Sequence, residues 1–431
     1  MELPKGWAQV ALEQLGIISS GKTPKPAELF SEGMYPYYKV ADMNTIGNEK
    51  YMIYTKSFLP TTYAGRVFPP NTIVFPKNGG AVLTNKKRIL KKHSLVDLNT
   101  GAYTPFTDLC FDYVFYLFST VDFRKLYKGS ALPTIDSNLV NNLIFPLPPL
   151  AEQHRIVAKI DALFSKLDKG VETLQTIRQQ LRIYRQAVLK WAFEGRLTNE
   201  NIYKYCRLQD LCYFITKGTT PKKDKMLSDY GDVPFIKVYN LTFSGMLDFT
   251  IDPTFVSYDT HNGFLLRSKV LPGDVLMNIV GPPLGKVSIV PYTFDEFNIN
   301  QAIARFRCKK ELNNRFLAHF LLFDGTIETI SKKSKATAGQ FNLTLEVCRD
   351  IELPLPNIDE QIKIVAKIES RLSVCDKLEQ IVDENLSKAQ ALKQSILKKA
   401  FAGQLVPQDP NDEPAEALLK RIKNTQSMKR K

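Results

Sequence analysis

The sequence has few of the residues that build metal centres, disulfides or membrane spans. Its 431 residues include four histidines and six cysteines, with no Cys-x-x-Cys pair and no two histidines four positions apart. These spacings disfavour a metal centre or a disulfide framework and are typical of a cytoplasmic protein. No run of eighteen apolar residues occurs, and the opening MELPKGWAQV lacks the apolar stretch of a signal peptide. We therefore expect no membrane span.

The sequence also lacks the motifs of the common nucleotide and DNA enzymes. It has no G-x-x-x-x-G-K-[ST] phosphate loop, no Asn-Pro-Pro-aromatic element of an adenine methyltransferase and no Asp…Glu-x-Lys nuclease cluster after a predicted strand. The glycine segments PKNGGAV (76–82) and VGPPLGK (280–286) indicate turns rather than dinucleotide-binding loops. We therefore expect no catalytic residue, no metal and no cofactor in this chain. A hidden methyltransferase stays as an alternative, which methyl transfer to DNA by the isolated chain would establish.

What the sequence does contain is a long internal repeat. IVAKI occurs at 156–160 and again 208 positions later, at 364–368. The same offset relates Pro146 to Pro354, and LKWAFEGRL (189–197) to LKKAFAGQL (397–405). Because no gap interrupts this register, the chain is an internal duplication.

Each copy of the repeat predicts a long amphipathic helix, at 150–197 and at 358–405. Apolar residues recur at alternating steps of three and four, which is typical of a coiled-coil seam. The residues predicted for the seam are Ile156, Ile160, Leu163, Leu167, Leu174 and Leu181 in the first copy, and Ile364, Ile368, Leu372, Leu378, Val382 and Leu392 in the second. A helix of roughly 40 residues would be about 60 Å long.

The two apolar stripes are expected to bury each other in an antiparallel coiled coil. Equivalent halves usually relate by a twofold axis, and antiparallel helices satisfy a twofold perpendicular to their length. The alternative, in which each helix packs on its own neighbouring domain, stays open.

The segments between the helices, 1–149 and 198–357, predict two similar globular α/β domains. Short apolar runs alternate there with Gly and Pro, as in short strands joined by turns. The segments align weakly with each other: GKTP (21–24) with GTTP (218–221), YPYYKVADM (35–43) with VPFIKVYNL (233–241), PPNTIVF (69–75) with LPGDVLM (271–277), and VDLNTGA (96–102) with FNINQAI (297–303). The expected fold is therefore α+β and pseudo-twofold, with a tail at 406–431 that adds a short helix at 414–423.

The formal net charge of +14 suggests a polyanionic partner, such as nucleic acid or an anionic membrane face. Lysine binds phosphate, and amide side chains can pair with adenine. The candidate DNA-binding residues are Lys22, Lys39, Asn44, Lys77 and Asn78 in the first domain, and Lys217, Lys237, Tyr239, Asn240, Asn278, Lys286 and Gln340 in the second. Each of them taken alone is better explained as an ordinary solvated surface group. Two domains on a rigid spacer could read two half-sites about one turn of DNA apart, which is about 34 Å.

The repeated segments resemble a known family. PLPPLAEQHRIVAKIDALFSKLD (146–168) and LPLPNIDEQIKIVAKIESRL (353–372) each follow a variable domain. They are similar to the two repeated helical regions of type I restriction–modification specificity subunits. The opening LPKGWAQVALEQLGIISSGKTP (3–24) resembles that family's entry into its first recognition domain. The resemblance covers essentially the whole chain.

The resemblance implies a subunit without enzymatic activity. Its two target recognition domains would each bind one part of a bipartite, asymmetric site on double-stranded DNA. The antiparallel helices would set the unread gap and bind two modification (methyltransferase) subunits. Those partners would bind S-adenosylmethionine and flip the target adenine out of the duplex, and restriction (translocase/nuclease) subunits would use ATP and Mg. The alternative is a coiled-coil scaffold with two peptide-binding domains, against which the charge of +14 argues.

Overall fold

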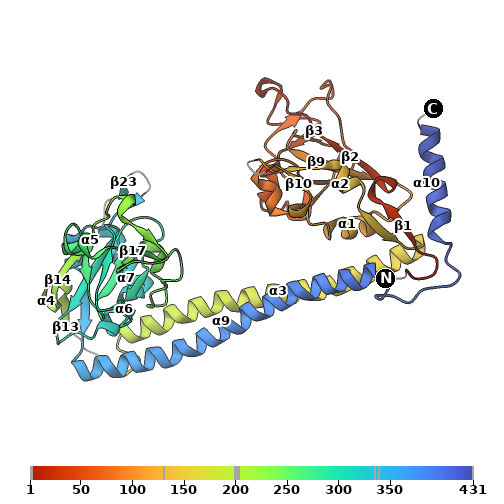
Figure 1. Cartoon of the computed structure of the whole chain (residues 1–431). Coiled ribbons are helices and arrows are strands. Elements are labelled where there is room, and N and C mark those ends of the chain that lie inside the picture. Colours follow the sequence, from red (N-terminus) through yellow and green to blue (C-terminus); the bar gives the residue numbers. More distant parts are fainter. Residues whose placement is uncertain (1–2, 130–131, 199–203, 334–335, 338–339, 430–431) are drawn as a thin grey trace. The chain divides into compact units, whose positions relative to one another are not determined.

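The computed structural model describes residues 3–129, 132–198, 204–333, 336–337 and 340–429, with the backbone alone described at 333, 336–337, 340–341 and 429. Its contacts divide the chain into two units, residues 1–172 with 386–431, and residues 173–385. Each unit contains one globular domain and part of both long helices (Figure 1). None of the described helices combines the length and hydropathy that a bilayer span requires.

The first unit contains two main sheets, two small two-stranded sheets and a helix that packs on the larger main sheet. The larger sheet has the order β2 (Gly16–Ser20), β9 (Thr100–Pro105), β6 (Ile73–Pro76), β7 (Arg88–Leu90), β4 (Tyr51–Met52). The smaller has the order β5 (Phe58–Leu59), β3 (Tyr35–Tyr38), β8 (Leu95–Val96). Helix α1 (Phe111–Ser119) buries Phe118 against the larger sheet, with its ring centroid 5.1 Å from that of Tyr103 and 5.6 Å from that of Phe75. Aromatic contacts of this kind dominate a core because each ring buries a large area.

The second unit repeats this plan. One sheet has the order β14 (Cys212–Lys217), β22 (Ile303–Cys308), β19 (Val275–Asn278), β20 (Val287–Ile289). The other has the order β15 (Leu227–Ser228), β17 (Thr254–Val256), β16 (Val233–Ile236), β21 (Phe297–Ile299), β18 (Lys269–Val270). Helix α6 (Asn314–Leu322) takes the place of α1. The prediction that the two domains share a fold is confirmed.

Short elements complete each domain and lead into the long helices. In the first unit, β1 (Ala8–Ala11) pairs antiparallel with β12 (Ile144–Leu147), and in the second, β13 (Lys204–Arg207) pairs with β25 (Glu352–Leu355) in the same way. The remaining strands and α-helices of the first globular domain are β10 (Tyr127–Lys128), β11 (Thr134–Ile135) and α2 (Ser137–Asn141). Those of the second are α4 (Leu208–Leu211), α5 (Tyr258–Asn262), α7 (Asp324–Lys333), β23 (Ala336–Thr337), β24 (Gln340–Phe341) and α8 (Leu345–Arg349).

One of the predicted alignments between the domains is wrong by two residues. β3 pairs in parallel with β8, Tyr38 opposite Val96, and β16 pairs in parallel with β21, Ile236 opposite Ile299. Val96 therefore corresponds to Ile299 and not to Phe297. Strands of two or three residues carry too little sequence pattern to fix such a register.

The long helices are α3 (Leu150–Phe193) and α9 (Ile358–Phe401), and they begin where the repeat predicts. In the second unit Arg178 pairs with Asp383, and Arg185 pairs with Asp376 at 2.5 Å. Residue numbers therefore increase along α3 in the direction in which they decrease along α9, so the two helices are antiparallel. In the first unit Asp168 pairs with Lys393. The predicted antiparallel arrangement is confirmed, and the pairs 168–393 and 376–185 exchange under the 208-residue repeat.

The seam of the helix pair is partly as predicted. Ile156 and Ile160 are buried with Ile396 of α9, and also with the core of the first domain, while Ile364 and Ile368 are buried with Val188 and the core of the second. Both expected modes of packing therefore occur at the helix ends. Further along, Leu181 and Val382 are buried, and the half-buried seam residues are Leu163, Leu167, Leu174 and Leu372.

The seam prediction is wrong for Leu378 and Leu392, which are 41% and 49% exposed. The helix turns the following residue toward α3 in both cases. Glu379 accepts a hydrogen bond from Arg185 at 2.9 Å, and Lys393 pairs with Asp168. At these two positions the contact between the helices is therefore an ion pair, whereas the apolar repeat predicted a buried leucine.

A Glu-Gln pair at the start of each long helix ties the helix to its domain. Gln153 is buried, donates to Pro148 O at 3.0 Å and accepts from Cys110 N at 3.1 Å. Gln361 donates to Pro356 O at 3.0 Å and accepts from Asn313 N at 2.8 Å. The same side chain therefore anchors α1 in one unit and α6 in the other.

The tail forms α10 (Ala415–Lys429), which packs on the first unit. Its N-terminal Ala415 N donates to Gly6 O at 2.9 Å, and Arg155 of α3 pairs with Asp412 at 2.6 Å. The predicted short helix is confirmed and extends beyond its expected end.

The ion pairs of the helix seam should contribute measurably to stability. We expect Arg185→Met to lower the free energy of unfolding by about 1 kcal/mol, because both carboxylate partners are partly solvated. Arg182→Met, on an exposed position of the same helix, should change it much less. Urea denaturation of the three proteins measures the difference, and equal midpoints would remove the role assigned to Arg185.

Candidate nucleic-acid interface

In the first unit, four turns meet at one edge of the two sheets. Lys22 N, after β2, donates to Val96 O of β8 at 3.1 Å. Lys77 N, after β6, donates to Asn99 O at 2.8 Å, and Leu98 N donates to Thr23 Oγ1 at 3.3 Å. We call this the first loop edge: residues 20–25, 39, 77–79 and 97–99.

The first loop edge carries three of the predicted lysines. Lys22 and Lys39 are exposed, whereas Lys77 donates through Nζ to Ser20 Oγ at 2.6 Å. Asn78 lies beside them and donates to Asn99 Oδ1 at 3.2 Å. Burial raises the pKa of the neighbouring Asp97, and the positive charge of Lys39 acts in the opposite direction. Exposed lysines beside amide groups can contact phosphate oxygens and base edges.

The second unit has the same arrangement at the corresponding turns. Thr219 N donates to Ile299 O at 3.2 Å, and Gln301 N donates to Thr220 Oγ1 at 3.4 Å. Gln301 is exposed and corresponds to Leu98. We call residues 217–222, 237–240 and 300–302 the second loop edge; Lys217 and Lys237 belong to it.

A carboxylate partly neutralises the second loop edge. The Tyr239 hydroxyl donates to Asp252 Oδ2 at 2.5 Å, and Lys237 Nζ lies 3.5 Å from the same oxygen. The Tyr239 hydrogen bond, followed by the charge of Lys237, lowers the pKa of the Asp252 carboxyl. Asp252 therefore stays charged and holds the side chains of Tyr239 and Lys237 in place.

Two glycines bring these turns into contact with the neighbouring strand. A Cβ on Gly21 would lie 1.7 Å from Val96 O, and a Cβ on Gly218 would lie 2.0 Å from Ile299 O. Such distances are far below any permitted contact, so each turn requires glycine to lie against its strand.

The DNA-binding predictions are wrong for Asn240 and Asn278. Both are 1% exposed. Asn240 donates to Ile251 O at 2.8 Å and accepts from Lys237 N at 2.9 Å. Asn278 donates to Pro283 O and accepts from Lys286 N, both at 2.9 Å. In each side chain both the amide NH₂ and the amide oxygen are hydrogen-bonded to the backbone of its own loop, so neither residue can pair with a base.

Of the three remaining predicted residues, two lie away from the loop edges, and the side chain of the third is not among the described residues. Asn44 is exposed at the end of the 3₁₀ turn Val40–Asn44, where it accepts from Lys86. Lys286 is half-buried on the loop that Asn278 holds. Gln340 lies in β24, and its side chain is outside the described residues.

The sequence reasoning missed four residues of the loop edges: Thr23, Asn99, Thr220 and Gln301. The aligned GKTP and GTTP segments contained a signal for the two threonines, which share one hydrogen-bonding role. Gln301 was hidden by the two-residue misalignment, which paired it with Thr100 instead of Leu98. Asn99 corresponds to Ala302, so the comparison of the two domains contains no signal for it.

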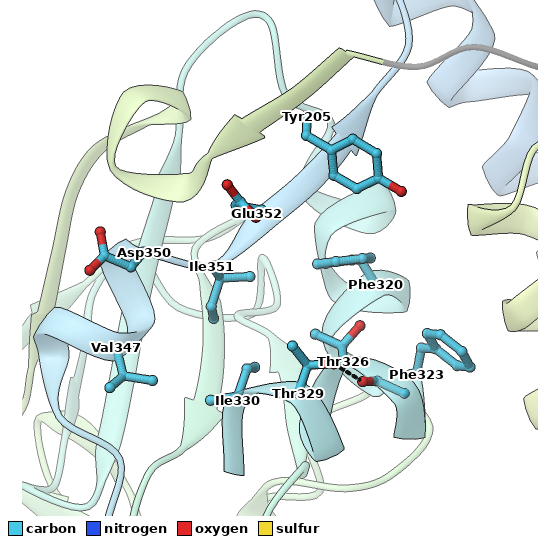
Figure 2. Close-up of a pocket in the computed structure, with 11 residues that line it drawn as sticks. Tyr205, Phe320, Phe323, Thr326, Thr329, Ile330, Val347, Asp350, Ile351 and Glu352 are labelled. Carbon is cyan, nitrogen blue, oxygen red and sulfur yellow. Dashed lines mark hydrogen bonds between the residues drawn. The ribbon is translucent and has the colours of Figure 1, made fainter. Parts of the chain in front are cut away.

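A cavity of about 260 Å³ in the second unit has a different character (Figure 2). Its walls include Phe320, Phe323 and Ile330, and Asp350 and Glu352 line it as well. Apolar walls with two carboxylates disfavour phosphate, so we do not assign this cavity to nucleic acid. Within the described residues, no three His, Cys, Asp or Glu side chains gather as a metal site.

Comparisons with known proteins agree with this picture. The family model described as "Type I restriction modification DNA specificity domain" matches residues 4–181 and 201–386. The EcoBI specificity subunit of Escherichia coli is 30% identical over 323 residues, which are 67% of this chain and 66% of that protein. The EcoKI specificity subunit of Escherichia coli K12 is 23% identical, over 98% of this chain and 96% of that one.

A solved structure has the same fold. One chain of a structure described as concerning complex assembly and conformational transition of the type I R-M system matches with a TM-score of 0.71. The match has 20% sequence identity and covers 94% of this chain and 100% of the other.

Proposed function

The chain belongs to the type I restriction–modification DNA specificity family, with DNA sequence specificity as its role, and we propose that each loop edge contacts one half of a bipartite site. The peptide-binding scaffold is not favoured. The duplicated loop edge carries this proposal. Lys39 of the first edge has a counterpart of equal charge in Lys237, and each edge has a second lysine beside its glycine, Lys22 or Lys217. The exposed Leu98 of the first edge is replaced by Gln301 at the corresponding position of the second.

This combination suits an asymmetric site. Lysines on both edges bind the phosphate backbone of either half-site without sequence preference. Differing side chains beside them provide different base contacts, since an apolar group suits a thymine methyl and a glutamine suits adenine. Two similar domains with unlike edges would therefore select two unlike half-sites.

We further propose that the chain is not catalytic and holds no cofactor. Two modification subunits would bind S-adenosylmethionine and methylate adenine, and restriction subunits would use ATP and Mg. The repeated helices support two modification subunits, because a duplicated surface offers two equivalent docking sites.

The loop edges predict a specific salt dependence of DNA binding. For the full chain with duplex DNA, Lys22→Ala with Lys39→Ala should weaken binding and reduce the slope of log K against log salt by about 0.9 per lost phosphate contact. Lys159→Ala on α3, which is also exposed, is the matched control. Fluorescence anisotropy at several salt concentrations measures both, and an unchanged slope in the double variant would contradict the assignment of the edge.

A further inference from the structure

Each unit has a groove between its pair of long helices and the domain helix, α1 or α6. The cavity volume is about 580 Å³ in the first unit and about 700 Å³ in the second. Five lining residues correspond at the 208-residue offset: Asp161, Phe164, Ser165, Asp168 and Leu397 in the first groove, with Glu369, Leu372, Ser373, Asp376 and Leu189 in the second. The floor of the groove is therefore part of the repeat.

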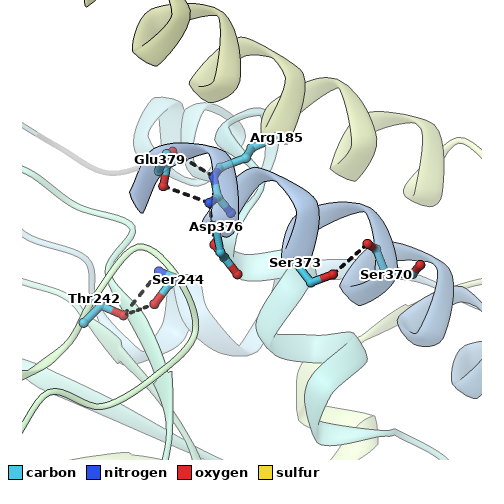
Figure 3. A network of polar contacts seen from close by, with 7 residues as sticks. All are labelled: Arg185, Thr242, Ser244, Ser370, Ser373, Asp376 and Glu379. Carbon is cyan, nitrogen blue, oxygen red and sulfur yellow. Dashed lines mark hydrogen bonds and ion pairs between the residues drawn. The ribbon is translucent and has the colours of Figure 1, made fainter. Parts of the chain in front are cut away.

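The floor carboxylates are held in equivalent ways. Asp168 pairs with Lys393, and Asp376 pairs with Arg185, as Figure 3 shows for the second groove. Tyr116 of α1 donates to Asp161, and Arg315 of α6 donates to Glu369 at 3.0 Å. Both grooves are thus fixed between helix pair and domain before any partner binds.

The rims of the two grooves differ. Ile89 N donates to Lys50 O at 2.9 Å, and the corresponding Ile289 N donates to Gly245 O at 3.0 Å, so Lys50 on the first rim is replaced by glycine on the second. The second rim instead carries Phe243, Met246 and Tyr292, which are 59%, 71% and 84% exposed.

The strand register also shows that the position of Tyr292 in the second unit is a lysine in the first. Ile73 is opposite Ile89 and Val275 is opposite Ile289. Three residues beyond these isoleucines lie Lys92 in the first unit and Tyr292 in the second. The first groove therefore has the cation Lys50 at its rim, where the second has large apolar side chains, and the position of Tyr292 is a lysine in the first unit.

Building on the proposed function, we propose that the two grooves dock the same segment of the two modification subunits, and that the groove of the second unit binds first and more tightly. A repeated floor suits two identical partners. Aromatic residues and methionine around a concavity are the side chains that dominate binding energy at interfaces, whereas lysine is depleted there.

The docked segment has a definite chemistry. An apolar side chain would lie over Leu189 and Leu372, and a basic residue would approach Asp376, whose carboxylate stays 62% exposed despite its pairing with Arg185. The groove is continuous with the α3–α9 seam, which supplies Arg185 and Asp376 from its two sides. In the first groove, burying Lys50 at the rim would cost desolvation of a charge.

The test is a titration of the full chain with the purified modification subunit, followed by calorimetry and native mass spectrometry. We expect two separable binding steps. Tyr292→Lys, which introduces the residue type of position 92, should weaken the tighter step about tenfold and leave the weaker one unchanged. The complementary change, Lys50→Tyr, which replaces the cation on the first rim by an aromatic residue, should strengthen the weaker step and bring the affinities of the two steps together.

Tyr230→Lys is the matched control, since Tyr230 is equally exposed in the same domain but does not line the groove. Two equal steps for the unaltered chain, or equal effects of Tyr292→Lys and Tyr230→Lys, would overturn the inference. A dimer of the chain alone that Tyr292→Lys disperses would also overturn it, because the occupant would then be a second copy. Absence of any complex with the modification subunit would instead refute the proposed function.

Discussion

Gly21→Ala is expected to abolish recognition of one half-site while the other half-site is still recognised. The added Cβ would lie 1.7 Å from Val96 O and 2.4 Å from Val96 C, both backbone atoms of a buried strand. The turn cannot move away from the strand without loss of a hydrogen bond, because Lys22 N donates to Val96 O at 3.1 Å. Separating turn and strand breaks this bond and displaces Lys22 and Thr23 together. We expect a loss of about 3 kcal/mol in the stability of this unit, the upper range for overpacking.

Gly218→Ala is the corresponding change in the second unit, where the Cβ would lie 2.0 Å from Ile299 O. Selection of binding sites from randomised duplexes, performed with both variants, should show loss of base preference at opposite halves of the site. Gly170→Ala on α3 is the control. Its Cβ meets nothing within 4 Å, and alanine should stabilise the helix by about 1 kcal/mol. Full base preference at both halves in both loop variants would show that DNA is read elsewhere.

The repeat made the helical part of the fold predictable. The constant offset of 208 residues between the two copies, with no gap, predicted where α3 and α9 begin. The alternating steps of three and four between their apolar residues predicted that the two helices pair. Leu378 and Leu392 show the limit of this reasoning. Whether a helix turns a leucine or the adjacent charged residue toward its partner depends on the charges it meets there, Arg185 and Asp168, which lie nearly two hundred residues or more away in the chain.

The loop edges were less predictable. Lys39 and Lys237 could be identified because they occupy the same position in the aligned YPYYKVADM and VPFIKVYNL segments, and Lys22 and Lys217 because each lies next to the aligned glycine. Asn240 and Asn278 are the residue type that can pair with a base. Only the structure shows that both side chains are buried and bind backbone groups of their own loops. An amide after a strand can either face solvent or satisfy buried backbone groups, and a single sequence does not distinguish these roles.

Truncating the glutamines at the starts of α3 and α9 should destabilise the chain strongly. Gln153→Ala would leave Pro148 O and Cys110 N without partners inside a core from which water is excluded. Each unpaired buried group costs about 1–3 kcal/mol, so we expect a loss of about 3 kcal/mol. Gln361→Ala should cost more, because Gln361 also donates to Glu311 O at 2.8 Å and thus holds three backbone groups.

The matched control is Gln179→Ala, at an exposed position of α3. Alanine favours helix there, so its effect should be close to zero. Denaturant unfolding gives the free energies, and hydrogen exchange locates the damage: the amide of Cys110 should exchange faster in Gln153→Ala, and that of Asn313 in Gln361→Ala. Each change should be local to its own unit, since each glutamine joins a long helix only to the domain that precedes it. If Gln153→Ala cost no more than Gln179→Ala, the Glu-Gln element would not be the joint between helix and domain, and its repetition would need another cause.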